Sequence, residues 1–474
     1  MPDENRRHHR GSSVLLALWA GCATLLCALL ATRAWDVERG ARNLSQDLSN
    51  VERGGRAGRL ARWRGWETEA LRSAIVAAGA PSRTASVRSP SIFDGLVSAV
   101  VAAARARNAS VGSTEPITAG PTQVTAFDGP RTGGALLAVG SDGARGLDAD
   151  TGHLLGRSLL PTTGAVARLS ADGAWALTAL GGSVQAWRVD GTLLHTLGAS
   201  SAAIRGMALA PAGDVAAVAF ANGSVALWNS ATWTALGELS TAPAEPVSLA
   251  FSPSGRQVAA GGSDGIVRVW DVASRSLAHT LQGHRGAVRS AVYTPDGERL
   301  LTGSDDGTAR LWDTRGGRSL AELGGRGDGH HGPVRSATTD TTGRYIVTAS
   351  DDGTARVWNA NSGRLLAVLM GHSGPVRAAI FAPAGDVVAT GGDDGTVRLF
   401  HGPSGEPLGV VGPLHGAVRA LAASASGNTL VAGADAVELV PLAYEAWLRR
   451  ACQLFPGEDH DADVRRVCER LTRR

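Results

Sequence analysis

Short apolar segments alternate with polar turns over most of the chain, from residue 123 to residue 440. One unit shows the pattern: AVRSAVYT (287–294) leads to the turn PDG, RLLTGS (299–304) leads to the turn DDG, and TARLWD (308–313) leads to a fourth apolar segment. Apolar side chains at alternate positions, between turns that contain glycine, are typical of antiparallel strands. The Asp-Gly dipeptides supply the positive φ that a tight hairpin needs. The pattern therefore predicts four strands in each unit.

The unit recurs along the chain, and an aromatic residue in its third strand marks each copy. The markers follow one another at intervals of 41, 42, 42, 46 and 42 residues, at Trp187, Trp228, Trp270, Trp312, Trp358 and Phe400. Weaker copies at 135–152 and 429–442 bring the number of units to eight. A thin sheet cannot bury both of its faces alone, so we expect the units to stack and to close into a ring that protects their edges.

The repeats thus predict an all-β, eight-bladed propeller over residues 123–440, with a seven-bladed ring as the alternative. The alternative stays open because the first and last units are degenerate, and one of them could serve as a cap. Residues 113–119, STEPITA, are a source for the outer strand that the last blade lacks. Such a strand would clasp the ring shut.

An apolar run near the N-terminus predicts a transmembrane helix at 14–32, after a basic tail at 1–13. No charged residue occurs between Gly11 and Thr32, and a helix of that length spans about 33 Å, enough for a bilayer core of about 30 Å. A cleaved signal peptide is the alternative. Arginines on both sides of the run leave the orientation open; we prefer an extracytoplasmic propeller over a cytoplasmic one.

Segments rich in alanine and charged residues flank the repeats and predict helices. Residues 33–108 are interpreted as a helical neck, 109–122 as a linker, and 441–474 as a C-terminal helical hairpin around the turn PGED. Cys452 and Cys468 could meet across that hairpin. We expect a disulfide between them outside the cytosol and two thiols inside it.

The repeats resemble those of WD-repeat β-propellers. The resemblance depends on the PDG turn and on two recurring dipeptides, GH at Gly283–His284, Gly329–His330 and Gly371–His372, and WD at Trp270–Asp271 and Trp312–Asp313. It covers about two thirds of the chain. The segment EAWLRRACQL, together with the order of anchor, neck and repeats, is similar to the C-terminal half of bacterial NTPase and WD-repeat signalling proteins.

This resemblance implies a hydrogen-bonded network inside a blade that joins a histidine, a hydroxyl, an aspartate and a tryptophan. The matching residues are His284, Thr302, Asp306 and Trp312; His330, Thr348, Asp352 and Trp358; and His372, Thr390 and Asp394, where Phe400 replaces the indole. A buried carboxylate is costly unless it is paired, and the imidazole and the hydroxyl can pair it. The units marked by Trp187, Trp228 and Trp270 are expected to lack both the histidine and the hydroxyl.

A second recurrence places arginine at one position of the first strand and an additional aspartate before the turn aspartate. These residues are Arg205, Arg289, Arg335, Arg377 and Arg419, with Asp305, Asp351 and Asp393. The resemblance implies a ring of alternating Arg and Asp on the top face, around the central channel. Because arginine recognises carboxylates and acidic peptides, this ring is the candidate partner-binding face. The competing interpretation is that the residues pair with one another across neighbouring blades and bind nothing.

Charge and motifs narrow the functional classes. The net charge is only +3 and the basic residues are dispersed, so we predict no nucleic-acid partner. The sequence has no P-loop or H-E-x-x-H motif, and its G-x-S-x-G match, GGSDG at 261–265, falls in a predicted hairpin turn of a repeat rather than in a strand-to-helix elbow. The repeated histidines share one register rather than one pocket, so no catalytic residue is assigned. The DDG turns lack the ligand spacing of a calcium loop, and no metal or cofactor is predicted.

The sequence therefore favours a membrane-tethered, non-catalytic β-propeller that binds proteins or peptides as an interaction or sensing scaffold. The alternative is an extracytoplasmic receptor for a small acidic ligand or peptide, bound at the top face or in the channel. A scaffold should present a broad binding face, whereas a receptor should present a closed, concave pocket.

Overall fold

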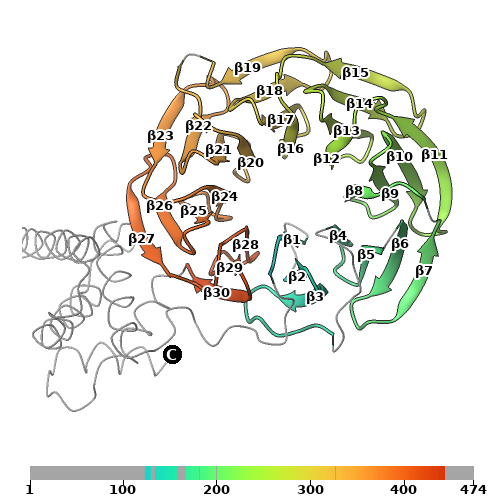
Figure 1. Cartoon of the computed structure of the whole chain (residues 1–474), viewed down its shortest axis with the longest axis horizontal. Coiled ribbons are helices and arrows are strands. Elements are labelled where there is room, and N and C mark those ends of the chain that lie inside the picture. Colours follow the sequence, from blue (N-terminus) through green and yellow to red (C-terminus); the bar gives the residue numbers. More distant parts are fainter. Residues whose placement is uncertain are drawn as a thin grey trace, which may run out of the picture. The chain divides into compact units, whose positions relative to one another are not determined.

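The computed structural model describes residues 123–129, 134–156, 166–180, 182–198, 200–325 and 327–442. These residues form eight antiparallel sheets, which follow one another around a common axis as the blades of a propeller (Figure 1). We number the blades 1 to 8 in chain order. In every blade the first strand lies nearest the axis and the last lies at the rim (Figure 1).

Blades 1 to 4 occupy the first half of the propeller. Their strands are β1 Ala126–Asp128, β2 Ala135–Gly140 and β3 Gly143–Asp148; β4 Ala167–Leu169, β5 Trp175–Leu180, β6 Ser183–Arg188 and β7 Leu193–Leu197; β8 Ile204–Leu209, β9 Val215–Phe220, β10 Ser224–Asn229 and β11 Thr234–Ser240; and β12 Pro246–Phe251, β13 Gln257–Gly262, β14 Val267–Asp271 and β15 Leu277–Leu281.

Blades 5 to 8 occupy the second half of the propeller. Their strands are β16 Val288–Tyr293, β17 Arg299–Ser304, β18 Ala309–Asp313 and β19 Ser319–Leu323; β20 Val334–Thr339, β21 Tyr345–Ser350, β22 Ala355–Asn359 and β23 Leu365–Leu369; β24 Val376–Phe381, β25 Val387–Gly392, β26 Val397–His401 and β27 Pro407–Val411; and β28 Ala420–Ala423, β29 Thr429–Gly433 and β30 Val437–Pro441.

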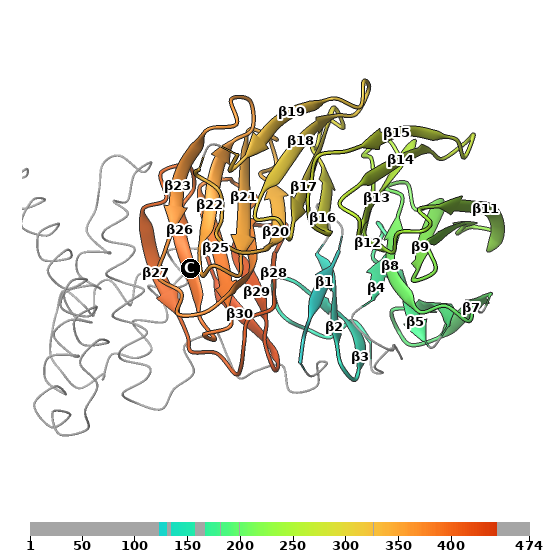
Figure 2. The ribbon, with the colours of Figure 1, turned by 45° about the horizontal axis from the view of Figure 1, so that its top comes forward.

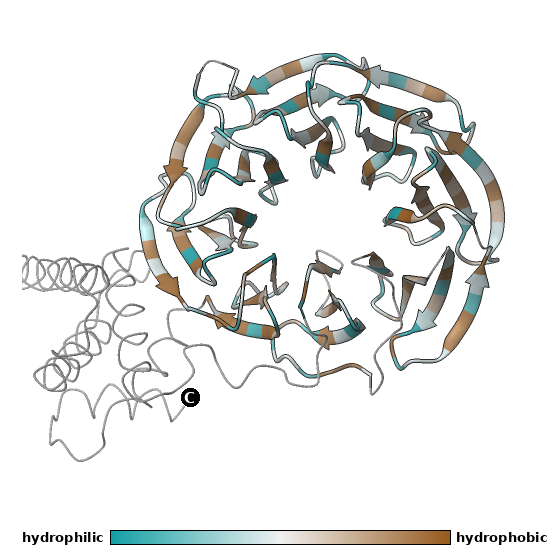
Figure 3. Ribbon diagram, in the orientation of Figure 1, coloured by the Kyte–Doolittle hydropathy of each residue, from teal (hydrophilic) through white to brown (hydrophobic). Residues whose placement is uncertain are grey.

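The depth of each strand in its blade explains its sequence. The second strand of blade 5, RLLTGS, is buried at every residue after the first, because other blades cover both of its faces. The rim strand SLAEL is buried only at its last residue, so serine and glutamate are tolerated there. Figure 3 shows that the strands carry most of the hydrophobic residues and that many of the connecting turns are hydrophilic.

Each hydrophobic core lies between two neighbouring blades rather than inside one blade. Leu301 and Leu311 of blade 5 pack with Val334, Ile346 and Trp358 of blade 6, and none of these side chains is more than 1% exposed. Blades 1 and 8 share a core of the same kind, with Val124, Leu136, Val431 and Val437. A blade therefore acquires its core only through its neighbours, as expected for a repeat too thin to fold alone.

Gly307 shows why the hairpin turns require glycine. Its φ is 79°, a left-handed conformation that costs an L-residue with a side chain free energy. A Cβ at this position would lie 2.7 Å from the carbonyl oxygen of His330 in the next blade. The turn thus needs glycine both for its own geometry and for its contact with the next blade.

Blades 1 and 8 close the ring. Innermost strands β1 and β28 are in contact, as are all the other neighbouring innermost strands around the axis. The backbone N–H of Val124 donates to the carbonyl of Ala434 at 2.7 Å, and the Ser426 hydroxyl donates to Asp150 at 2.5 Å. Seen obliquely, the blades follow one another from β1 to β30 without a missing unit (Figure 2). The prediction of eight blades is confirmed, and the seven-bladed alternative is wrong.

Two predictions about the terminal blades concern residues at the edge of the described ranges or outside them. Blades 1 and 8 have three strands each among the described residues, although Leu154 forms a bridge to Leu147 at the rim side of blade 1. The proposed clasp strand at 113–119 lies outside the described residues. So do the predicted transmembrane helix at 14–32, the neck and linker through 122, and residues 443–474 with Cys452 and Cys468. Among the residues that are described, we find no helix with the length and apolar character of a membrane span.

Candidate functional site

The Arg–Asp positions cluster where the innermost strands begin, at the end of the axis that we call the top mouth. Two nitrogen atoms of Arg289, Nε and Nη2, donate hydrogen bonds to the carboxylate of Asp305 in the same blade, and Nη2 lies 2.6 Å from Oδ2. The same contact recurs between Arg335 and Asp351, and between Arg377 and Asp393. The sequence spacing of 16 residues is the same in all three blades, because each arginine and its aspartate face one another across the first two strands.

These pairs are also joined between blades. Nη1 of Arg335 lies 3.4 Å from Oδ1 of Asp305, and Nη1 of Arg377 lies 2.9 Å from Oδ1 of Asp351. The result is one continuous chain of alternating charges across blades 5, 6 and 7. We call it the Arg–Asp arc: Arg289, Asp305, Arg335, Asp351, Arg377 and Asp393.

The arc does not extend into a complete ring, contrary to the expectation from the resemblance. Blade 4 carries Val247 and Ser263 at the two equivalent positions, so it offers neither charge. Arg205 of blade 3 pairs instead with Glu245. Arg419 of blade 8 lies 3.7 Å from Asp435 of its own blade, beyond hydrogen-bonding distance. The two outlying arginines are therefore held by separate local pairs.

Pairing keeps the arc charged and leaves part of it open to solvent. The hydrogen bonds to Asp305 raise the pKa of Arg289, and those to Asp393 raise the pKa of Arg377. The three arginine side chains are 40%, 32% and 33% exposed. Since a guanidinium has five N–H donors, each arginine can hold its aspartates and still offer donors outward.

The histidine networks lie in the same three blades, beneath the turns that carry the arc. In blade 5, the His284 ring is 2.9 Å from Asp306 through Nδ1 and 2.8 Å from the Thr302 hydroxyl through Nε2. The indole N–H of Trp312 donates to the same hydroxyl at 2.9 Å. In blade 6, Nδ1 of His330 lies 2.9 Å from Asp352, and Nε2 lies 2.8 Å from the Thr348 hydroxyl. The indole N–H of Trp358 donates to the same hydroxyl at 3.0 Å.

The networks determine the protonation of their members. Burial by itself would raise the pKa of Asp306 and Asp352. Hydrogen bonds from the histidine, from backbone N–H groups and from the hydroxyl after the turn, that of Thr308 or Thr354, hold the pKa of each far below the usual range. Burial lowers the pKa of His330 and His372, and the neighbouring aspartates offset only part of that effect. At neutral pH the networks of blades 6 and 7 thus pair a buried carboxylate with a neutral imidazole.

Blade 7 has the same network without its indole donor. His372 contacts Asp394 at 3.0 Å and the Thr390 hydroxyl at 2.9 Å, while Phe400 occupies the tryptophan position. Burial opposes ionisation of Asp394, but its hydrogen bonds lower its pKa to about 2.

One expectation about the degenerate blades is wrong. In blade 2, the Trp187 indole donates to the Thr178 hydroxyl at 3.0 Å, so this blade does supply a hydroxyl although it was expected to lack one. The sequence comparison missed it because Thr178 precedes its tryptophan by nine residues, whereas Thr302 precedes Trp312 by ten. The hairpin between the two strands is one residue shorter.

The arrangement is that of a structural element rather than of a catalytic centre. Each histidine is enclosed in its own blade, and the three networks do not converge on a common space that a substrate could enter. Among the described residues, no group of three or more His, Cys, Asp or Glu side chains is arranged to hold a metal ion.

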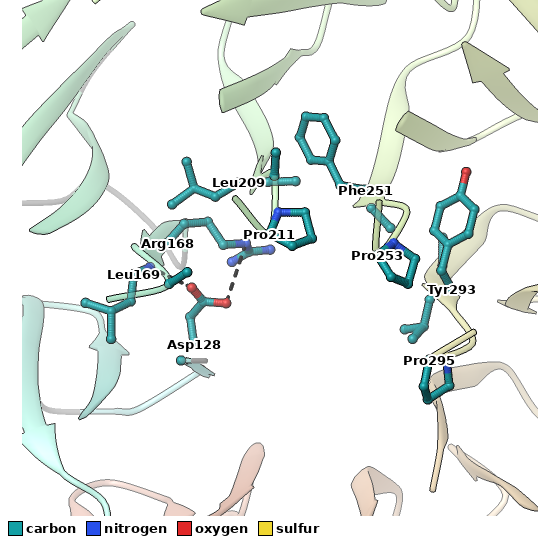
Figure 4. A pocket seen from close by; sticks show the side chains of 16 residues that line it. Asp128, Arg168, Leu169, Leu209, Pro211, Phe251, Pro253, Tyr293 and Pro295 are labelled. Carbon is teal, nitrogen blue, oxygen red and sulfur yellow. Dashed lines mark hydrogen bonds and ion pairs between the residues drawn. The ribbon is translucent and has the colours of Figure 1, made fainter. Parts of the chain in front are cut away.

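The opposite end of the axis, the bottom mouth, contains a feature that sequence analysis missed. A cavity of about 560 Å³ lies where the innermost strands of blades 1 to 5 end (Figure 4). Asp128 of β1 and Arg168 of β4 lie on one side of it, and Tyr293 and Pro295 lie across from them (Figure 4). Asp128 and Arg168 occupy the position in the innermost strands of their blades that Val292 occupies in β16. An alignment of the repeats strand by strand would therefore have revealed two charged residues in place of an apolar one.

Comparison with known proteins identifies the repeats. The family model of the WD domain, G-beta repeat, matches residues 235–271, 275–313, 321–359 and 363–401. These residues are WD repeats, and together with the eight-bladed ring they support a WD-repeat β-propeller family. The four matches coincide with the rim strand of blade 3 and with blades 4 to 7, which include every blade with a complete histidine network. A comparison with curated protein sequences gave no match.

Solved WD-repeat and propeller structures share this fold at low sequence identity. The computationally designed Ika8 protein is similar with a TM-score of 0.59 at 24% identity, over 69% of this chain and 98% of that protein. The C-terminal WD40 domain of Sif2 is similar with a TM-score of 0.59 at 18% identity, again over 69% of this chain and 98% of that domain. At these identities the likeness concerns the fold alone.

Proposed function

We propose that this WD-repeat protein is a non-catalytic scaffold for interaction or sensing, and that a partner protein binds at the top mouth of its propeller. The observation that carries the proposal is the Arg–Asp arc, which presents half-exposed charges of both signs across three adjacent blades. Propellers of this family commonly bind proteins or peptides, and nothing among the described residues resembles a catalytic site.

The pairing inside the arc favours a broad protein surface over a small acidic ligand. Each arginine already holds one or two aspartates, and a small acid would have to compete with them for the same nitrogen atoms. A protein surface with both acidic and basic groups can contact the outward donors of the arginines and the free oxygen lone pairs of the aspartates without breaking the pairs. This competition favours the scaffold over the alternative, a receptor for a small acidic ligand or peptide.

We further propose that residues 14–32 tether the scaffold to a membrane. The support is the uncharged apolar run, which is long enough to cross a bilayer core. Expression with and without residues 1–32, followed by carbonate extraction of membranes, tests this part alone. Full-length protein should stay in the membrane pellet and the truncated protein should not; extraction of both would refute the tether.

The partner site is tested by removing the arginines of the arc. We expect the triple variant Arg289→Ala, Arg335→Ala and Arg377→Ala to lose specific partners in proximity cross-linking, while it keeps the thermal unfolding midpoint within a few degrees of the original. The matched control removes three exposed arginines away from the top mouth, with Arg315→Ala, Arg318→Ala and Arg364→Ala.

The control variant should capture the same partners as the unmodified chain. If the arc variant also captures them all, the proposal is wrong. If the arc variant unfolds instead, the competing interpretation, in which the arc only holds blades together, is correct.

A further inference from the structure

The bottom-mouth cavity has the size and lining of a ligand site. Its volume of about 560 Å³ falls within the range of small-molecule and side-chain pockets. Its wall is mostly apolar, and the residues that shape it most are Leu209, Phe251, Tyr293, Pro211, Pro253 and Pro295. The prolines begin the turns after three successive innermost strands, and their rigid rings lie along one side of the cavity (Figure 4).

One charged pair interrupts this apolar wall. Asp128 accepts a hydrogen bond from the backbone N–H of Leu169 at 2.6 Å, and its other oxygen lies 3.8 Å from Nε of Arg168. Nη1 of Arg168 in turn donates a hydrogen bond to the carbonyl of Ala167 at 2.8 Å. The contact between the two charges is therefore loose, and part of the guanidinium is directed to the backbone.

The carboxylate of Asp128 is incompletely compensated. Burial raises its pKa, and Arg168 and the Leu169 N–H offset only part of that effect. Solvent still reaches the pair, because the side chains of Asp128 and Arg168 are 26% and 30% exposed. A positively charged group that entered the cavity could approach Asp128 and complete its hydrogen bonding.

The charges next to the cavity also favour a positively charged ligand. Asp172 and Asp296 stand in the turns that directly follow the lining residues Ala171 and Pro295, and turn hydrogen bonds lower the pKa of both carboxyls. Arg256, in the corresponding turn of blade 4, acts instead on Asp271 toward the rim. The lining itself holds one carboxylate and one arginine, Asp128 and Arg168, and the adjoining turns add Asp172 and Asp296, the second of them near Arg299. Carboxylates therefore predominate beside the loosely held Asp128, and a cation is favoured over an anion.

We propose that the bottom-mouth cavity binds a ligand that joins one ammonium or guanidinium group to an apolar group, with the cation at Asp128 and the apolar part against the proline side. The ligand is either a lysine or arginine between apolar residues of a polypeptide, or a free aliphatic amine. This site lies at the other end of the axis from the Arg–Asp arc, so it does not depend on the proposed function.

Isothermal titration of the purified full-length chain tests the proposal with defined probes. The peptide acetyl-Leu-Lys-Phe-amide should bind, and its counterpart with glutamate in place of lysine should not. Asp128→Asn removes the charge but keeps an oxygen that accepts from Leu169, so we expect about tenfold weaker binding of the lysine peptide. Asp264→Asn is the matched control, because it also removes a carboxylate paired with an arginine but lies in the hairpin between β13 and β14, outside the cavity, and it should leave binding unchanged.

Two further arms complete the test. Hexylamine identifies the source of the ligand: affinity equal to that of the peptide favours a free amine, and binding of the peptide alone favours a polypeptide. Ala250→Leu narrows the cavity and should weaken both probes, while thermal unfolding reports whether the variant folds. The proposal is overturned if neither probe binds, if the glutamate peptide binds as well as the lysine peptide, or if Asp128→Asn has no effect.

Discussion

Blades 5 to 7 and blades 1 to 3 have the same sheet architecture but different internal contacts. Blades 5 to 7 contain the histidine networks and the Arg–Asp arc. Blade 2 retains only the bond between Trp187 and Thr178, and blade 3 has Asn222 where blade 5 has Asp306. Blades 2 and 3 are joined instead by aromatic contacts, since Trp233 meets Trp175 edge-to-face at a centroid distance of 5.3 Å and stacks on His195.

The comparison teaches that the apolar pattern makes the blade and that the polar network is an addition to it. Buried clusters of equal kind lie between blades 2 and 3 and between blades 5 and 6. Satisfied polar networks stiffen a structure because their bonds are directional, and they are costly when one member is lost. The near-identical repeats should therefore be more rigid and also more sensitive to single substitutions.

The largest effect should come from breaking a network. Asp306→Ala leaves the buried His284 ring, the Thr308 hydroxyl and the Arg285 N–H without their shared acceptor. We expect the free energy of unfolding to fall by about 3 kcal/mol, measured by urea denaturation with tryptophan fluorescence.

Asn222→Ala is the matched change in a blade without the network. Asn222 is an exposed turn residue that accepts from Ser224 only, so its loss should cost less than about 1 kcal/mol. Equal costs at the two positions would contradict the view that the networks distinguish blades 5 to 7.

A smaller effect should follow from converting blade 6 into the arrangement of blade 7. Trp358→Phe removes the indole N–H that donates to Thr348 and leaves the smaller ring that Phe400 provides in blade 7. We expect a loss of about 2 kcal/mol from the hydrogen bond and the reduced volume, with the eight-bladed fold retained. Unchanged stability in the same denaturation experiment would show that the indole adds nothing to the network.

The smallest effect concerns the dependence of stability on pH and rests on the histidines of blades 6 and 7. His330 and His372 have a lowered pKa in the fold, so below about pH 6.5 the unfolded chain binds more protons than the folded chain, and stability falls as the pH decreases. A second loss is expected as the pH falls from about 3.8 toward 2, where Asp394 is protonated.

Unfolding curves between pH 7.5 and 5.5 test the first loss. His331→Gln removes an exposed imidazole whose charge contributes to the lowered pKa of His330, so it should change the pH profile less than His330→Gln does. His330→Gln should flatten the profile. A profile of the unmodified chain that is already flat in this range would contradict the prediction.

Much of this fold was predictable because its information is local and repeated. The interval between aromatic markers and the Gly-containing turns predicted four-stranded units and their number, and the family resemblance implied that Arg289 and Asp305 lie at one mouth of the channel. The prediction was weaker where a repeat departs from the common pattern. A one-residue difference in a hairpin concealed Thr178, and Val247 and Ser263 interrupt a ring that the other repeats suggested.

The sequence by itself determined the blades, because alternating apolar residues and positive-φ turns act within about forty residues. Tertiary structure alone decided which partners the charged residues take. Ring closure joins Val124 to Ala434, and the contact of blades 1 and 2 brings Asp128 to Arg168, 40 residues apart in the sequence. The physical reason is that each core and each ion pair between blades is made only when separate repeats stack, so no single repeat contains it.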